Sequence, residues 1–234
     1  VSAFLLNRSS DLLVDKLNIL DLTGLNTANV VNMDHTFNNC KEISSLGTMT
    51  QFNTQSVKNL DSTFNNCELL TNIGSSNELS INSAENASNM FNNCKSLANL
   101  IISNPVASGT DSPLTDMSYM FNDWILLNNL DLSGLNTENV VNMDHTFNNC
   151  NQITSLANLN TQSVTNFEYT FNDCTNLISL GNGNELSLPA AVKATHMFNK
   201  CEALTNLKFS SGSISALTDM SYMFSDCEKL NNLD

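Results

Sequence analysis

The chain has 234 residues, of which 41% are hydrophobic and only 14% are charged, with 9 basic against 23 acidic residues and a formal net charge of −14. This acidic balance argues against binding to nucleic acid or to an anionic membrane surface, because both need a basic patch. No apolar run is long enough to cross a membrane. We expect the charge to keep an elongated protein soluble and monomeric.

The first twenty residues differ from the rest of the chain. Residues 1–20 carry Leu17 and Leu20 in the pattern of the later units but lack their phenylalanine and cysteine. We interpret this segment as a partial or capping repeat, because terminal repeats must shield an open core. Val1 is not preceded by Met or by a signal segment, and the last repeat breaks off at Asp234. We therefore expect the chain to be a fragment of a longer protein or a mature form lacking its ends.

Residues 21–234 consist of eight copies of one unit. The eleven residues from Val140 to Cys150 are identical to those from Val30 to Cys40. A fixed period of this kind predicts a solenoid with one continuous core. The phenylalanines that anchor the units are spaced by 24 to 30 residues: Phe37, Phe64, Phe91, Phe121, Phe147, Phe171, Phe198 and Phe224.

Each unit predicts a short helix followed by a short strand. Apolar residues stand seven and four positions before the phenylalanine and three positions after it, which is the spacing of one helical face. A Leu-x-x-Leu-x-Leu pattern follows, as at Leu127, Leu130 and Leu132, and its alternation favours a strand. The predicted fold class is an α/β repeat solenoid, a right-handed superhelix like that of leucine-rich repeats with units of about 24–30 residues.

The units form a larger pattern of two four-unit blocks. Units one and five are near copies, units three and seven share Asn-Glu-Leu-Ser, and units four and eight share Leu-Thr-Asp-Met-Ser-Tyr-Met-Phe. We therefore expect one block over about 21–130 and a duplicate over 131–234.

The core motif Met-x-x-x-Phe-x-x-Cys-x-x-Leu-x-x-Leu, with Asn-Thr-x-x-Val upstream, resembles the BspA-like (treponemal-type) leucine-rich repeat surface proteins. The resemblance covers roughly Leu17 to Asp234. Members of that family are largely surface proteins of bacteria and protists, and those characterised are mostly adhesins or host-binding proteins. The resemblance implies a cell-surface or secreted location and an extracellular protein or glycan as partner, but it names no ligand.

Seven cysteines occupy one repeat position, three residues after the phenylalanine. Equivalent residues on packed helices would lie about 8–10 Å apart, whereas a disulfide needs Cα atoms within roughly 7 Å. We therefore predict free buried thiols, and the absence of a Cys-x-x-Cys motif or a Cys/His cluster argues against a metal site. Trp124 breaks this column beside the insertion Asn104–Pro113. It is either a tolerated irregularity or a local bulge that forms a binding feature.

A polar row stands eight positions after the phenylalanines, between two core leucines and on the outward side of the predicted strands. It consists of Ser45, Asn72, Asn99, Asn129, Ser155, Ser179, Asn206 and Asn232. Two interpretations remain open. The row is either a solvated face that resists aggregation or a shallow binding surface for a protein or a glycan. Asparagine also follows seven of the eight phenylalanines, which predicts an internal ladder of side chains that satisfies backbone groups at the turns.

The sequence gives no sign of catalysis. It contains no Gly-x-Ser-x-Gly elbow, no phosphate-binding glycine loop and no calcium-binding loop, so we expect no enzyme activity, catalytic residues or cofactor. The leading hypothesis is a non-enzymatic ligand-binding module of a surface protein that acts through the strand face. The alternatives are a structural spacer without a ligand and an intracellular scaffold. Two sequons, at Asn7 and Asn86, are short enough to arise by chance.

Overall fold

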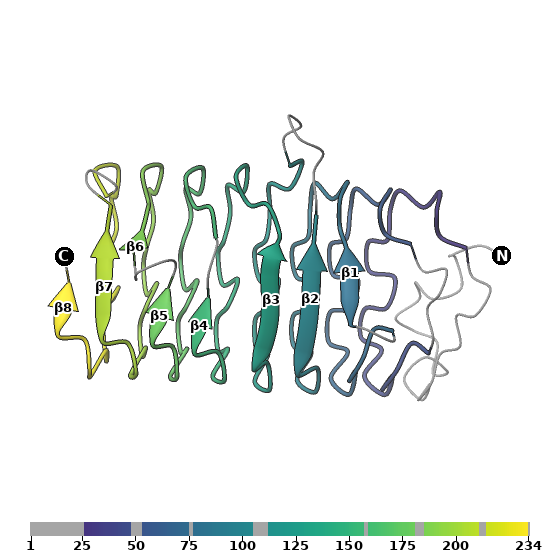
Figure 1. Cartoon of the computed structure of the whole chain (residues 1–234), viewed down its shortest axis with the longest axis horizontal. Coiled ribbons are helices and arrows are strands. Elements are labelled where there is room, and N and C mark those ends of the chain that lie inside the picture. Colours follow the sequence, from purple (N-terminus) through teal and green to yellow (C-terminus); the bar gives the residue numbers. More distant parts are fainter. Residues whose placement is uncertain are drawn as a thin grey trace.

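The computed structural model describes residues 26–47, 53–74, 77–104, 112–156, 159–180, 185–210 and 214–233. These residues form one elongated row of stacked coils, which follow one another along the row in sequence order (Figure 1). We number the coils 1 to 8 by their anchoring phenylalanines, from Phe37 in coil 1 to Phe224 in coil 8. The capping repeat expected at residues 1–20 lies outside the described residues.

Short parallel strands line one side of the row (Figure 1). They are β1 (Glu78–Ser80), β2 (Asn99–Ser103), β3 (Asn129–Gly134), β4 (Ser155–Leu156), β5 (Ser179–Leu180), β6 (Glu185–Leu186), β7 (Asn206–Phe209) and β8 (Asn232–Leu233). The sheet orders are β1-β2-β3, β4-β5 and β6-β7-β8, and every pair is parallel. Leu100, Leu156 and Leu207 point inward while the residues before them point outward. We call this side of the row the strand face.

The predicted helix in each unit is wrong: the described residues contain strands and turns but no helix. The cause is visible in coil 5, where His145 and Asn149 have φ angles of 53° and 60°. Left-handed residues at these two positions cannot belong to a right-handed α-helix. The chain instead makes tight turns, in which the N–H groups of Thr146 and Asn148 donate to carbonyls three residues earlier. The fold is therefore not an α/β repeat with a helix in each unit.

The N–H groups that a helix would use internally are donated to the next coil. In coil 5 the donors are Met143, His145, Phe147 and Asn149, which reach carbonyls of coil 6 at 2.8–3.0 Å. The same four bonds recur at each of the seven junctions from coil 1 to coil 8, always from the earlier coil to the later one. These donors lie in one stretch of each coil, Met143 to Asn149 in coil 5, which we call the turn segment. The turn segments thus link the coils on the side of the row that lacks strands.

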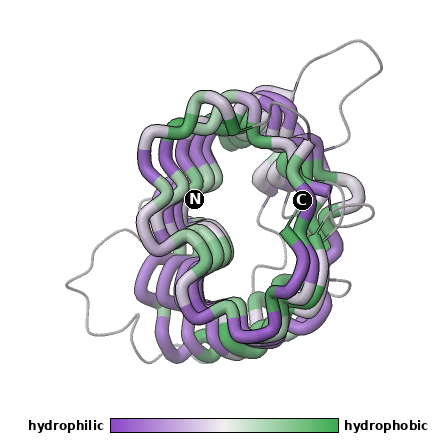
Figure 2. Tube along the Cα trace, turned by 90° about the vertical axis from the view of Figure 1, so that its left-hand side faces the viewer, coloured by the Kyte–Doolittle hydropathy of each residue, from purple (hydrophilic) through white to green (hydrophobic). Residues whose placement is uncertain are grey.

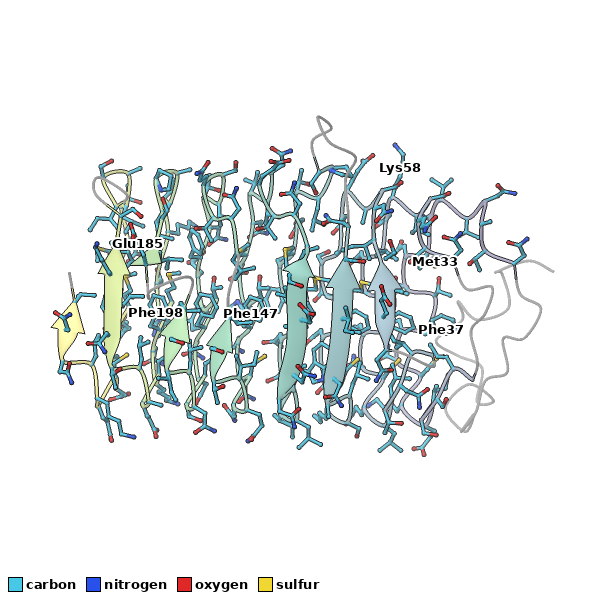
Figure 3. The ribbon with its side chains drawn as sticks, in the orientation of Figure 1. Met33, Phe37, Lys58, Phe147, Glu185 and Phe198 are labelled. Carbon is cyan, nitrogen blue, oxygen red and sulfur yellow. The ribbon has the colours of Figure 1, made fainter. Side chains whose placement is uncertain are left out.

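Figure 2, which looks along the row, shows the coils superposed around one interior. Buried apolar side chains from every coil fill it. The anchoring phenylalanines stack on one another along the row, with ring centroids 5.2–6.4 Å apart, and Phe37, Phe147 and Phe198 mark their course in Figure 3. The buried positions that suggested a helical face are therefore the inward corners of consecutive turns.

The expected asparagine ladder is present on the coils beside the phenylalanines. From Asn65 to Asn199, each amide nitrogen donates to the amide oxygen of the previous coil at 2.6–3.0 Å. The amides thus bond to one another, rather than to the backbone as predicted. A hydrogen bond of this kind contributes about 1 kcal/mol to stability.

Replacing Phe147 with Ala should lower the free energy of unfolding by about 3–5 kcal/mol, because the ring is fully buried between Phe121 and Phe171. Denaturant unfolding measures the loss. Val141→Ala in the same coil is the matched control, since that side chain is 43% exposed and should change stability by less than about 0.5 kcal/mol. Equal effects of the two substitutions would contradict the assigned anchor.

Asn149→Val should destabilise the protein more than Asn149→Gly. Both variants lose the amide bond to Asp123, which is 2.8 Å long. Only valine also meets the steric penalty at φ 60°, which adds about 1–2 kcal/mol. Thermal and denaturant unfolding of the two variants measure the difference. If both variants unfold alike, the left-handed backbone is not what excludes the helix.

Candidate functional site

The predicted polar row lies on the outward side of the strand face. Its members face each other in four neighbouring pairs, because equivalent residues of adjacent coils stand in parallel register. The pairs are Ser45 with Asn72, Asn99 with Asn129, Ser155 with Ser179, and Asn206 with Asn232. Ser45, Asn72 and Ser179 are half-buried and the other five are exposed. The row therefore offers short, uncharged hydrogen-bonding groups to solvent.

A hollow of about 350 Å³ opens in the strand face among β4, β5, β6 and the end of β7. We call it the strand-face hollow. Its apolar lining residues, which we call the floor, are Leu156, Leu159, Phe171, Leu180 and Leu186. Its polar lining residues, which we call the rim, are Asn160, Thr161, Gln162, Glu185, Ser187 and Ser210. An apolar floor with a few polar groups around it is typical of a ligand pocket.

The hollow forms where the repeat is shortest. Only 24 residues separate Phe147 from Phe171. The chain passes from the inward Leu156 to the buried Thr161 in five residues, whereas the next coil takes eight residues from Leu180 to Leu188. The strand-face hollow therefore lies beside the shorter of these two connections. The 24-residue spacing was the sequence signal for this feature, and the polar row alone did not reveal it.

The rim residues of the hollow differ in whether they already have hydrogen-bond partners within the protein. The Thr161 hydroxyl donates to the Ser187 carbonyl and is buried. The Glu185 carboxylate accepts a hydrogen bond from the Ser210 hydroxyl at 2.8 Å and stays exposed. Its neighbour in register on β7 is Lys208. Gln162 is also exposed. Donors and acceptors therefore both surround the apolar floor.

Trp124 lies inside the core rather than at the surface. The indole is fully buried and stacks beside Phe91 and Phe121, with its centroid 5.5 Å from each. These two phenylalanines lie 6.4 Å apart, and the indole N–H donates to the Leu97 carbonyl. The residue therefore acts on packing, and most of the adjacent insertion, residues 105–111, lies outside the described residues.

The prediction of free thiols is confirmed for all seven cysteines, six of which are buried while Cys227 is half-buried. The reason given from helix spacing is wrong, since these coils have no helix. From Cys67 onward, each thiol donates to the carbonyl of the anchoring phenylalanine of the coil before, at 3.0–3.2 Å. Burial raises the pKa of Cys174 to about 12.

Five rings form a second stack on the outer surface of the turn segment, and sequence reasoning missed it. Each ring stands two residues before its phenylalanine, in the left-handed position. The rings alternate as Tyr119, His145, Tyr169, His196 and Tyr222, with centroids 4.4–4.7 Å apart. We call this stack the aromatic ladder. Burial raises the pKa of Tyr119, and the nearby carboxylates of Asp144 and Glu168 raise it further.

Comparison with known proteins gives a family but no activity. A family model described as "Mycoplasma protein of unknown function, DUF285" matches residues 9–113, 83–180 and 115–233. No curated protein matches the chain. Within the described parts of the chain, no helix has the length and apolar character of a membrane span.

Two solved structures are similar in part. One is a leucine-rich cell surface protein from Faecalibacterium prausnitzii A2-165, with 15% identity, a TM-score of 0.44, and coverage of 85% of this chain and 74% of the other. The second is a leucine-rich repeat protein from Bacteroides ovatus ATCC 8483, with 16% identity, a TM-score of 0.38, and coverage of 88% and 64%.

The buried thiols predict a loss of stability at alkaline pH. The pKa of Cys174 is about 12 in the folded protein, whereas a thiol in an unfolded chain has a pKa of about 8.5. Above pH ~8.5 the unfolded chain releases protons that the folded chain keeps, so the free energy of unfolding falls as the pH rises. Denaturant unfolding between pH ~8.5 and ~10 measures this slope. Cys150→Ala/Cys174→Ala should flatten the slope, and an unchanged slope would contradict the assignment to these thiols.

Proposed function

The chain belongs to the DUF285 family of mycoplasma proteins of unknown function, and we propose that it is a non-enzymatic ligand-binding module of a cell-surface protein. The module binds an extracellular protein or glycan through its strand face. The strand-face hollow is the observation that supports this function best, because it combines an apolar floor with a polar rim on the side of the molecule that carries the polar row. The surface location is supported by the resemblance of the repeat motif.

The position of the hollow favours an extended ligand. Ser155 and Ser179 of the polar row begin the strands β4 and β5, whose leucines form part of the floor. A partner that places one apolar group in the hollow therefore lies next to uncharged hydroxyl groups. Binding sites commonly combine a small central anchor with surrounding polar contacts that exclude water. The polar row provides these contacts without the desolvation cost of a charged group.

A structural spacer is the second candidate, and the repeated bonding between coils favours it. The same four backbone hydrogen bonds join coil 1 to coil 2 and every later pair. An array held in this way transmits position along its length without any need for a ligand. The two functions differ in one consequence: in a spacer, substitutions on the strand face leave every interaction unchanged.

The binding hypothesis predicts that Gln162→Trp abolishes an interaction found by screening the protein against extracellular-matrix proteins and a glycan array. Gln162 is exposed and lines the hollow, so an indole there fills the space without removing a core group. Gln55→Trp is the matched control, because Gln55 holds the equivalent exposed position of coil 2 and is not one of the residues that line the strand-face hollow. Surface plasmon resonance with each variant gives the change in Kd.

A second variant, Asn129→Arg/Ser155→Arg, tests the polar row separately. If it alone abolishes binding, the row rather than the hollow holds the ligand. If a partner binds both Gln162→Trp and Asn129→Arg/Ser155→Arg as it binds the wild type, its binding site lies outside the strand face. The spacer gains support if no partner binds, or if binding is the same for the wild type and all variants.

A further inference from the structure

We propose that Asp34, His35 and Asp61 form a surface site for a divalent first-row transition-metal ion of the Zn²⁺ type. One ligand atom from each residue lies within 4.8 Å of the other two. Asp34 and His35 belong to coil 1, and Asp61 belongs to coil 2. A bound ion would therefore join two neighbouring coils. The site is separate from the strand face and does not depend on the proposed function.

The backbone places these three side chains together. His35 has a φ of 54°, in the left-handed position of its turn segment. Its Nδ1 contacts Asp34 Oδ1 and lies 3.9 Å from Asp61 Oδ2. The N–H of His35 donates to the Asp61 carbonyl at 2.9 Å, so the coil junction itself fixes the relative position of the two residues. The imidazole thus faces two carboxylates, one from its own coil and one from the next.

Asp61 is held by groups that leave one of its oxygens available. Its Oδ1 accepts hydrogen bonds from the hydroxyls of Ser62 and Ser88 at 3.1 and 2.9 Å. Its Oδ2 is the atom nearer to His35 Nδ1. Outer partners that orient a ligating carboxylate raise metal affinity, because less side-chain freedom is lost when the ion binds.

The donor set indicates the class of ion. An imidazole with carboxylates suits Zn²⁺ and neighbouring transition ions, whereas Ca²⁺ and Mg²⁺ need more oxygen ligands. Zinc bonds of about 2.0–2.2 Å would bring the ligand atoms to within roughly 3.5 Å of one another. The side chains of Asp34 and His35 are 41% and 42% exposed and that of Asp61 is 26% exposed, so they have room for this rotation. Water would complete the coordination shell.

Coil 5 contains a natural control. Asp144 and His145 repeat the Asp–His pair, with Nδ1 2.6 Å from the carboxylate, but the following coil offers Glu168 in place of Asp61. The ring of His145 is also stacked between Tyr119 and Tyr169, with centroids at 4.4 and 4.5 Å. Beside His35 the next coil places Ser62 instead of a ring. His145 is therefore fixed in its stack, whereas the surroundings of His35 suit an ion.

Isothermal titration calorimetry with ZnCl₂, in the presence of excess MgCl₂, tests the site on the intact chain. The wild type should bind one ion per chain at this site. His35→Ala and Asp61→Asn should weaken binding by ~10-fold or more, whereas His145→Ala should bind like the wild type. The Asp61→Asn side chain still accepts hydrogen bonds from Ser62 and Ser88. Weaker zinc binding by this variant would therefore reflect the lost carboxylate ligand and not a change in the fold.

Thermal unfolding gives an independent readout. Zinc should raise the Tm of the wild type, because the ion binds the folded junction of coils 1 and 2, and it should not raise the Tm of His35→Ala. Circular dichroism without zinc checks that the variants fold alike. The proposal is overturned if zinc does not bind, if His35→Ala binds as the wild type does, or if His145→Ala loses binding equally.

Discussion

The row of hydrogen bonds between successive turn segments is the constraint on which the rest of the molecule depends. Left-handed residues such as His145 and Asn149 turn every second N–H toward the next coil. These groups would otherwise be buried without a partner, at a cost of about 1–3 kcal/mol each. Each coil must therefore stack on a coil of the same shape. This requirement sets a constant spacing between coils on the side that lacks strands, and the short parallel strands continue it on the other side.

Constant spacing brings every side chain next to its equivalent in the neighbouring coil. The phenylalanines stack, the asparagine amides form a chain of hydrogen bonds, and the rings from Tyr119 to Tyr222 form the aromatic ladder. Chemically similar residues suit such columns, because aromatic rings stack on one another and amides form hydrogen bonds with one another. The thiols are different, since each donates to a backbone carbonyl rather than to another thiol. Residues that repeat in the sequence thus contact their equivalents in the neighbouring coils of the structure.

Departures from the repeat create the features that could carry function. The strand-face hollow lies at the 24-residue unit, and Phe171 is one of the residues that line it. At the first coil, Asp34 and His35 meet Asp61, whereas at coil 5 the same Asp–His pair meets Glu168 and is enclosed by tyrosines. Trp124, the most conspicuous exception in the sequence, is absorbed by the core instead. The change in spacing, and not this conspicuous residue, coincides with the strand-face hollow.

The sequence by itself determined the repeating unit, its eight phenylalanine anchors, the buried thiols and the outward polar row, because burial of apolar positions follows directly from their pattern. It did not separate a helical face from a series of turns, since both bury residues such as Met143, Phe147 and Cys150. Only the tertiary structure decided between them, because a left-handed Asn149 is stable when its N–H finds a carbonyl of another coil. The strand-face hollow and the Asp34–His35–Asp61 cluster likewise arise from contacts between coils, and no single unit contains them.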